Sequence, residues 1–330
     1  MLKKTVLYIL CAALLLGTLM LASCEKKKVI TVYATSEDYR IENAQKMFNE
    51  KFPDLEIRVE YKSTGDLSSK LIAEGDKTDC DIIMELENAY LEKISDNLAT
   101  LEDVDFSVYK EEYVSASHKY VPFVISSGSI IVNPTVLSEK NLPVPTSYDD
   151  LLKEEYKGLI SMPNPKSSST GYIFLLNLVN AWGEAEAFAY FDKLSENISG
   201  AGFTSSGSGP VPALKLGEAA IGLGMTHQAV AEINDSGANI EVHFFAEGSP
   251  YDVYSSAVIK GKETDADVMR VFEYLVSEIT PIDKELYAPE TIYRDRTFEK
   301  ANYPENIPYG DMTGLEDITR KEGLLNQWKY

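Results

Sequence analysis

Hydrophobic positions in this chain alternate between short β-like runs and amphipathic helical stretches. Residues 29–34 form an apolar run, and residues 35–38 (Thr-Ser-Glu-Asp) then supply a cap and first-turn acids for a helix. Further strands are expected at 55–61 and 80–84, each followed by a helix. This β–α–β order predicts a parallel sheet with helices on both faces.

A long β-rich run at 121–132 interrupts the alternation, and Asn133–Pro134 ends it. We interpret this run as a crossing between two lobes. The pattern then predicts a second set of elements: helix 147–155, strand 159–162, helices 168–182 and 184–198, strand 220–225, helix 226–233, strand 240–245, a returning strand at 255–260 and an amphipathic helix at 265–278.

The predicted fold class is therefore α/β with two lobes, because about 300 residues exceed what one core usually holds. Each lobe is expected to be a mainly parallel sheet flanked by helices, with two β crossings between the lobes. We assign 29–124 and 249–290 to lobe 1, and 125–248 to lobe 2. Residues 291–330 are expected to be a C-terminal segment that wraps the outside.

The first 28 residues predict that the protein is exported from the cytoplasm. Lys3 and Lys4 precede an uncharged apolar run, which is typical of a secretory signal. Residues 21–24 (Leu-Ala-Ser-Cys) resemble the lipobox of bacterial lipoproteins. We therefore predict a signal peptide over 1–23, lipidation of Cys24, a tether over 24–28, and anchoring to the outer face of the bacterial cell membrane, on its extracellular or periplasmic side. A plain signal, or an uncleaved anchor helix with an incidental cysteine, is the alternative.

Composition excludes several classes of function. The net charge of −21 becomes −23 without the two signal lysines, and the acids are spread along the chain, which disfavours binding to nucleic acids or anionic lipids. Only Cys80 remains once Cys11 is cleaved and Cys24 acylated, so no intrachain disulfide is expected. The sequence has no His-x-x-x-His or Cys-x-x-Cys pair, nucleophile elbow or phosphate-binding glycine loop. We expect no enzyme activity, metal or cofactor, with a cleft hydrolase as the alternative.

Four hydroxyl-rich turns fall where a strand or loop hands over to a helix: 35–36, 63–65, 167–171 and 205–209. Such turns offer hydroxyls and free backbone N–H groups, which favour anions. With two turns in each lobe, they are expected to line opposite walls of one cleft, although each alone could be an ordinary helix cap. The candidates for ligand binding from these turns are Ser36, Thr64, Ser168, Ser169, Thr170, Gly171, Ser206 and Ser208.

Other candidate ligand-binding residues lie near the predicted cleft. Glu85, Glu247 and Asp252 could accept hydrogen bonds from sugar hydroxyls or an ammonium group, and Ser127 lies in the predicted crossing. His227 follows the strand predicted at 220–225. The alternatives are solvated loop acids and a capping or packing histidine.

A family resemblance rests on the order and spacing of several segments. They are 29–34 (Val-Ile-Thr-Val-Tyr-Ala), 81–83 (Asp-Ile-Ile), 130–133 (Ile-Ile-Val-Asn), 162–165 (Met-Pro-Asn-Pro), 168–171 (Ser-Ser-Thr-Gly), 215–223 (Lys-Leu-Gly-Glu-Ala-Ala-Ile-Gly-Leu), 247–248 (Glu-Gly) and 257–261 (Ala-Val-Ile-Lys-Gly). The chain resembles ABC-importer solute-binding proteins, nearest those handling ferric iron, phosphonates, sugar phosphates and thiamine. The resemblance implies a type II periplasmic-binding-protein fold that closes over a ligand, a monomer, and an ABC permease with its ATPase as partners.

The resemblance also bears on the ligand. Ferric-binding members typically carry adjacent tyrosines near the turn that is 205–209 here, and this chain has no adjacent tyrosines. Sugar-phosphate-binding members resemble it in placing a histidine where His227 stands and an acid in the loop of Glu247. This implies that the serine turns hold phosphate, while His227 and Glu247, with Asp252 as a further candidate, hold the organic part. We expect a small phosphorylated or phosphonate solute; ferric iron with a bound anion, and a surface sensor without transport, are alternatives.

Overall fold

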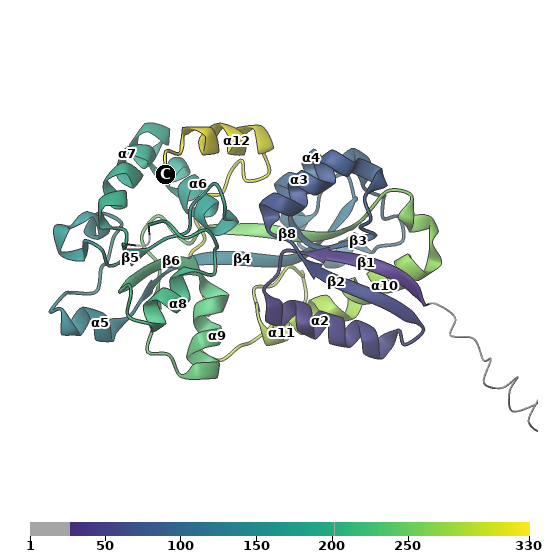
Figure 1. The fold of residues 1–330 in the computed structure, drawn as a ribbon, viewed down its shortest axis with the longest axis horizontal. Helices are drawn as coiled ribbons and strands as arrows, with labels where there is room; N and C mark the ends of the chain where they lie inside the picture. Colours follow the sequence, from purple (N-terminus) through teal and green to yellow (C-terminus); the bar gives the residue numbers. More distant parts are fainter. Residues whose placement is uncertain (1–26, 201) are drawn as a thin grey trace, which may run out of the picture.

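The computed structural model describes residues 27–200 and 202–330. The predicted signal peptide, Cys24 and the first residues of the tether lie outside the described residues. Within the described part of the chain, no helix is long and apolar enough to span a membrane. The elements form two lobes that share one sheet, with strand order β2-β1-β3-β8-β4-β6-β5 and β7 beside β4 (Figure 1).

Lobe 1 is built around three parallel strands, as the β–α–β pattern predicts. Its strands are β1 (Lys28–Ala34), β2 (Leu55–Tyr61) and β3 (Ile82–Glu87). Its helices are α2 (Asp38–Lys51), α3 (Thr64–Glu74), α4 (Asn88–Lys93), α10 (Ala266–Tyr274) and α11 (Thr280–Leu286). Ile30 and Val32 of β1 face a core shared with α2, whereas Tyr33 faces a second core shared with α3. This alternation buries both faces of the sheet.

Lobe 2 has shorter strands than lobe 1. Its strands are β5 (Ile160–Ser161), β6 (Ile221–Met225) and β7 (Glu241–His243). Its helices are α5 (Pro134–Glu139), α6 (Ser169–Trp182), α7 (Glu184–Leu194), α8 (Pro210–Lys215) and α9 (Thr226–Ser236). β5 and β6 are parallel, and α6 is buried along most of its length in the core of the lobe.

Two long strands join the lobes, which confirms the predicted crossings. β4 (Tyr120–Val132) pairs antiparallel with β8 (Tyr251–Val258) as far as Ser127, and from Gly128 it pairs antiparallel with β6. The change of partner falls at Gly128. A larger residue would clash there, because a Cβ atom would lie 2.9 Å from both Phe174 and Pro250. Each crossing strand is antiparallel to the parallel strands of one lobe: β8 pairs antiparallel with β3 in lobe 1, and β4 pairs antiparallel with β6 in lobe 2.

One predicted helix, 147–155, is wrong. The structure has two short 3₁₀ turns there, Asp149–Leu152 and Glu154–Tyr156. The side-chain amide of Asn197 donates to the carbonyl oxygens of Leu151 (2.7 Å) and Lys153 (2.9 Å). The backbone N–H groups of Lys153 and Tyr156 bond three residues back, to Asp150 and Lys153, so the segment forms 3₁₀ turns that the Asn197 side chain holds in place. The helix predicted at 265–278 is also divided, since α10 passes into a π turn at Leu275–Ile279.

The C-terminal segment wraps the molecule only in part, because it also completes the core of lobe 2. Ile292 and Tyr293 pack in lobe 1, and the chain then returns to lobe 2, where α12 (Ile318–Gln327) lies beside α6 and α7 (Figure 1). Trp328 is 2% exposed, and its ring centroid lies 5.3 Å from Phe191. The segment is therefore a third, irregular link between the lobes.

Replacing Trp328 with alanine should destabilise the protein by about 3–5 kcal/mol, because it empties a buried aromatic site. Urea unfolding followed by circular dichroism measures this loss. The control is Leu216→Ala, at a leucine that is 73% exposed, and it should change stability little. Equal effects of the two substitutions would contradict the structural role of Trp328.

Candidate functional site

All four hydroxyl-rich turns line one cavity of about 580 Å³ between the lobes. Lobe 1 supplies the first turns of α2 and α3, and lobe 2 supplies the turns before α6 and α8 together with the start of α9. The lining residues are Thr35, Ser36, Glu37, Asp38, Tyr39, Tyr61, Ser63, Thr64, Ser167, Ser168, Ser169, Ser205, Ser206, Gly207, Ser208, Val211, Pro212, Met225, Gln228, Ala231 and Glu232. We call this cavity the cleft.

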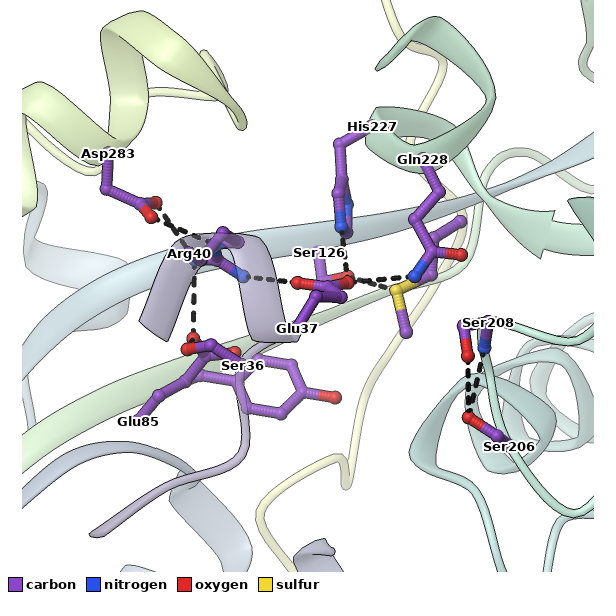
Figure 2. A network of polar contacts seen from close by, with 12 residues as sticks. Ser36, Glu37, Arg40, Glu85, Ser126, Ser206, Ser208, His227, Gln228 and Asp283 are labelled. Carbon is purple, nitrogen blue, oxygen red and sulfur yellow. Dashed lines mark hydrogen bonds and ion pairs between the residues drawn. The ribbon is translucent and has the colours of Figure 1, made fainter. Parts of the chain in front are cut away.

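The lobe 2 wall presents most of the hydroxyls. Ser206 and Ser208 contact each other at 2.8 Å and are both exposed (Figure 2). Ser168 precedes α6 and lines the cleft, and its side chain caps no backbone N–H group of α6 among the described residues. Ser169 accepts a hydrogen bond from the Tyr254 hydroxyl at 2.7 Å.

Two further candidates support the lobe 2 wall from behind. Thr170 is 1% exposed, and its hydroxyl has no partner among the described residues. Gly171 is required by packing, because a Cβ there would lie 2.5 Å from the Pro163 carbonyl oxygen. The close approach at Gly171 seats α6 against the 163–165 loop.

The lobe 1 turns are partly occupied by their own contacts. Ser63 caps α3 by accepting from the backbone N–H of Asp66 at 3.2 Å, which is the ordinary role that such residues play. Thr64 lines the cleft beside it. Ser36 donates its hydroxyl proton to Glu85 and is 1% exposed.

Glu37 connects the two lobes across the cleft (Figure 2). Its Oε1 atom lies 2.9 Å from His227 Nε2 and accepts from Gln228 Nε2 at 2.8 Å, both at the start of α9. Its Oε2 atom accepts from Arg40 at 3.1 Å. Burial would raise the pKa of the Glu37 carboxyl, but the facing His227 and Arg40 hold that pKa well below its ordinary value. Glu37 therefore remains a carboxylate at neutral pH.

Arg40 gathers the buried charges behind Glu37. Its guanidinium donates two parallel hydrogen bonds of 2.8 Å to Asp283 of α11 and lies 3.3 Å from Glu85. Burial raises the pKa of Glu85, while Arg40 opposes that rise. Glu85 thus faces Arg40 and Ser36, and does not line the cleft.

Lys284 lies fully buried beside this cluster. Its ammonium nitrogen has no hydrogen-bond partner among the described residues. Burial lowers the pKa of Lys284 to about 8, against the attraction of Asp283. A charged, unpartnered lysine costs stability in the folded state.

The remaining predicted site residues lie outside the cleft lining. Ser127 donates to Glu290 (2.6 Å), and its hydroxyl oxygen lies 3.0 Å from that of Thr226, in the crossing region. Glu247 lines a separate cavity of about 230 Å³ beside Tyr148, Trp182 and Tyr190.

Asp252 lies in a buried charged cluster at the α12 contact. Lys321 of α12 pairs with Glu87 of lobe 1, and burial together with Glu87 raises the pKa of Asp252 well above its ordinary value. His227 is 2% exposed and reaches the cleft only through Glu37. Ligand roles for the site residues stay predictions.

Sequence reasoning missed several residues of the cleft. In the sequence Glu37 is marked only as a first-turn acid of α2, and no local pattern marks Gln228. Tyr39 and Tyr61 are two of 20 tyrosines, and no local pattern singles them out.

The electrostatics of the cleft are unusual for an anion site. Among the described residues, no lysine or arginine lines it, so hydroxyls and helix N-termini are its donors for an anion. The described residues contain no group of three His, Cys, Asp or Glu side chains that could hold a metal. Burial raises the pKa values of Tyr39 and Tyr61, and Glu37 and Asp38 respectively add to the effect.

Comparisons with known proteins agree with this architecture. A family model described as bacterial extracellular solute-binding protein matches residues 80–282. The Salmonella typhimurium phosphoglycerate transport regulatory protein PgtC is 24% identical over 227 residues, which cover 67% of this chain and 55% of PgtC.

Two solved structures share the fold at low sequence identity. The periplasmic binding protein AfuA from Actinobacillus pleuropneumoniae, with fructose-6-phosphate bound, has a TM-score of 0.80 and 21% identity, covering 92% of this chain and 98% of AfuA. Iron-bound HitA from Pseudomonas aeruginosa has a TM-score of 0.75 and 17% identity, covering 92% of this chain and all of HitA.

Replacing Glu37 with glutamine should lower stability at pH 7 by about 2 kcal/mol, because the charge facing Arg40 and His227 is lost. The pKa of Glu37 is lower in the folded protein than the ordinary glutamate pKa of about 4.3. Its carboxylate therefore contributes fully to stability above pH 4.3, and this contribution is lost as the pH falls through the pKa of the folded protein. Urea unfolding between pH 7 and pH 3 should show the gap to wild type closing. The control is Glu102→Gln, at an exposed loop acid. A gap in stability that stays constant from pH 7 to pH 3 would contradict the role of Glu37 as a stabilising carboxylate.

Replacing Lys284 with methionine should stabilise the protein at pH 7 by about 2 kcal/mol, since it removes a buried charge. Because the folded pKa is about 8, wild-type stability should rise between pH 8 and about 10.4, and the advantage of the variant should shrink there. Unfolding curves at pH 7 and pH 10 measure this, with the exposed Lys46→Met as the control. A destabilised variant at pH 7 would show that Lys284 is paired.

Proposed function

The chain belongs to the family of bacterial extracellular solute-binding proteins, and we propose that its cleft captures a small phosphorylated or phosphonate solute for an ABC importer. The observation that carries this proposal is the convergence of hydroxyl-rich turns from both lobes on one cavity. A tetrahedral oxyanion accepts many hydrogen bonds, which is what neutral hydroxyl and N–H donors supply.

Closure of the lobes follows from donors on both walls. A solute that accepts from lobe 1 and lobe 2 together binds the closed form better than the open form, so binding shifts the population toward closure. The continuous strands β4 and β8 act as the hinge, and the closed face is the surface that a permease reads. No chemical step is required of the protein.

The comparisons support a phosphorylated ligand. PgtC is named for phosphoglycerate transport, and AfuA holds fructose-6-phosphate. The chain spans 55% of the length of PgtC. The shared fold and the hydroxyl-lined cleft favour a solute with a phosphoryl group, which phosphoglycerate and fructose-6-phosphate have in common.

Ferric iron is the second candidate, because HitA shares the fold and binds iron. The cleft of this chain opposes it. Tyr39 and Tyr61 are the tyrosines of the lining, and both have raised pKa values, whereas ferric iron takes tyrosine as the phenolate. Both come from lobe 1, and the 205–209 turn carries serines.

The family works outside the cytoplasm, on the periplasmic or extracellular side. Acylation of Cys24 would hold a monomeric receptor beside its permease and ATPase, and would so raise its effective concentration there. Cys80 is buried, and burial raises the pKa of its thiol, so it takes no part.

Calorimetric titration of the purified protein tests this function. The panel is glucose 6-phosphate, 3-phosphoglycerate, 2-aminoethylphosphonate, inorganic phosphate and ferric citrate. Binding of at least one organic phosphate or phosphonate in the micromolar range or tighter is expected. Binding of ferric citrate alone, with a visible tyrosinate-to-iron absorption band, would overturn the proposal.

Replacing both Ser206 and Ser208 with alanine should weaken the bound organic phosphate or phosphonate by about 2 kcal/mol or more, roughly 30-fold, because hydrogen bonds to a charged group are lost. The fold should be unaffected, since both side chains are exposed. Ser138→Ala, at an exposed serine of α5, is the matched control. Unchanged affinity in the double variant would remove this turn from the site.

A further inference from the structure

Gln228 lines the cleft and carries an unsatisfied acceptor oxygen. Its side-chain nitrogen donates to Glu37, which stays ionised and can only accept, so the orientation of the amide is fixed. Its oxygen then points away from Glu37 (Figure 2). Gln228 is 8% exposed, and this oxygen has no partner among the described residues. A buried acceptor in a folded protein normally has a donor partner, and Gln228 belongs to the lining that a bound solute would contact.

The charges around Gln228 indicate what kind of donor fits. Three acids line the cleft, Glu37, Asp38 and Glu232, and no basic residue lines it. Glu232 is already paired with Lys215 at 2.5 Å, and Glu37 with Arg40. Asp38 is exposed and makes no hydrogen bond or ion pair with any described residue. A second acidic group on the solute would be repelled here, whereas a positive group would be attracted.

Two aromatic rings flank the same acids. Tyr39 is 39% exposed and Tyr61 is 53% exposed, and both line the cleft. Tyr39 is positioned by Tyr287, whose ring centroid lies 5.1 Å away. Accessible tyrosine faces beside a carboxylate attract an ammonium group by cation–π interaction.

We propose that the solute is zwitterionic: a phosphorylated or phosphonate compound whose amine docks against Gln228, Asp38 and the tyrosine faces while its oxyanion meets the serine turns. This inference rests on the proposed function and narrows it. It resolves the conflict between an anionic solute and a cleft whose charged lining residues, among those described, are all acids. It also separates this chain from proteins that take a solute with two acidic groups.

Four phosphonates of similar size test the inference by calorimetry. They are 2-aminoethylphosphonate, 2-hydroxyethylphosphonate, propylphosphonate and 3-phosphonopropionate, which end in an ammonium, a hydroxyl, a methyl and a carboxylate. The amine should bind at least about tenfold tighter than the methyl compound, since a buried acceptor gains a charged donor. The carboxylate should bind most weakly. Equal binding of the amine and hydroxyl compounds, or of the amine and carboxylate compounds, would overturn the inference.

Substitutions then locate the amine. Asp38→Asn should weaken 2-aminoethylphosphonate by about threefold and leave propylphosphonate unchanged or slightly tighter. Glu102→Asn is the matched control and should affect neither compound. Tyr61→Leu should reduce the preference for the amine, whereas Tyr61→Phe should keep it because the ring remains. An equal loss for both compounds in Asp38→Asn would overturn the assigned contact.

The two proposals fail in distinguishable ways. If propylphosphonate, inorganic phosphate or glucose 6-phosphate binds but the amine gives no gain, the zwitterion inference fails and the proposed function stands. If no phosphate or phosphonate binds to a protein that unfolds cooperatively, the proposed function itself fails, and the inference with it.

Discussion

The strand β4 is the constraint on which the arrangement of this protein depends. It pairs with β8 as far as Ser127 and with β6 from Gly128, so a single continuous strand belongs to both lobes. The change of partner fixes how the sheet of lobe 1 meets the sheet of lobe 2. The turns after β1 and β2 in lobe 1 and the turns before α6 and α8 in lobe 2 thereby come to the same cleft.

Charged side chains around that cleft contact groups of opposite charge within the protein. Arg40 is shared by Glu37, Glu85 and Asp283, and Glu37 in turn reaches His227 and Gln228 of the opposite lobe. The Arg40 charge is paired with these protein carboxylates and is not offered to a solute. Anion recognition is therefore left to hydroxyls and N–H groups. These donors impose direction on an oxyanion without attracting every polyanion, which suits a receptor that must select.

The sequence predicted the turns because their signals are local. A serine or threonine before a helix, or a glycine after it, is visible without any tertiary contact, and all four turns reached the cleft. The contacts made across the lobes gave no such signal. Arg40 and Asp283 are 243 residues apart, and Gln228 meets Glu37 only once both lobes are placed. The wrong prediction of a helix at 147–155 also involves a contact with no local signal. The Asn197 side chain that donates to the Lys153 carbonyl comes from 44 residues further along the chain.

A crystal structure of the protein grown with 2-aminoethylphosphonate gives the most direct view of how the cleft is used. The phosphonate oxygens should lie within hydrogen-bond distance of donors from both lobes, with the serine turns before α6 and α8 on one wall and the first turns of α2 and α3 on the other. A phosphonate held by one lobe only, or bound in another cavity while the cleft holds solvent, would contradict the account.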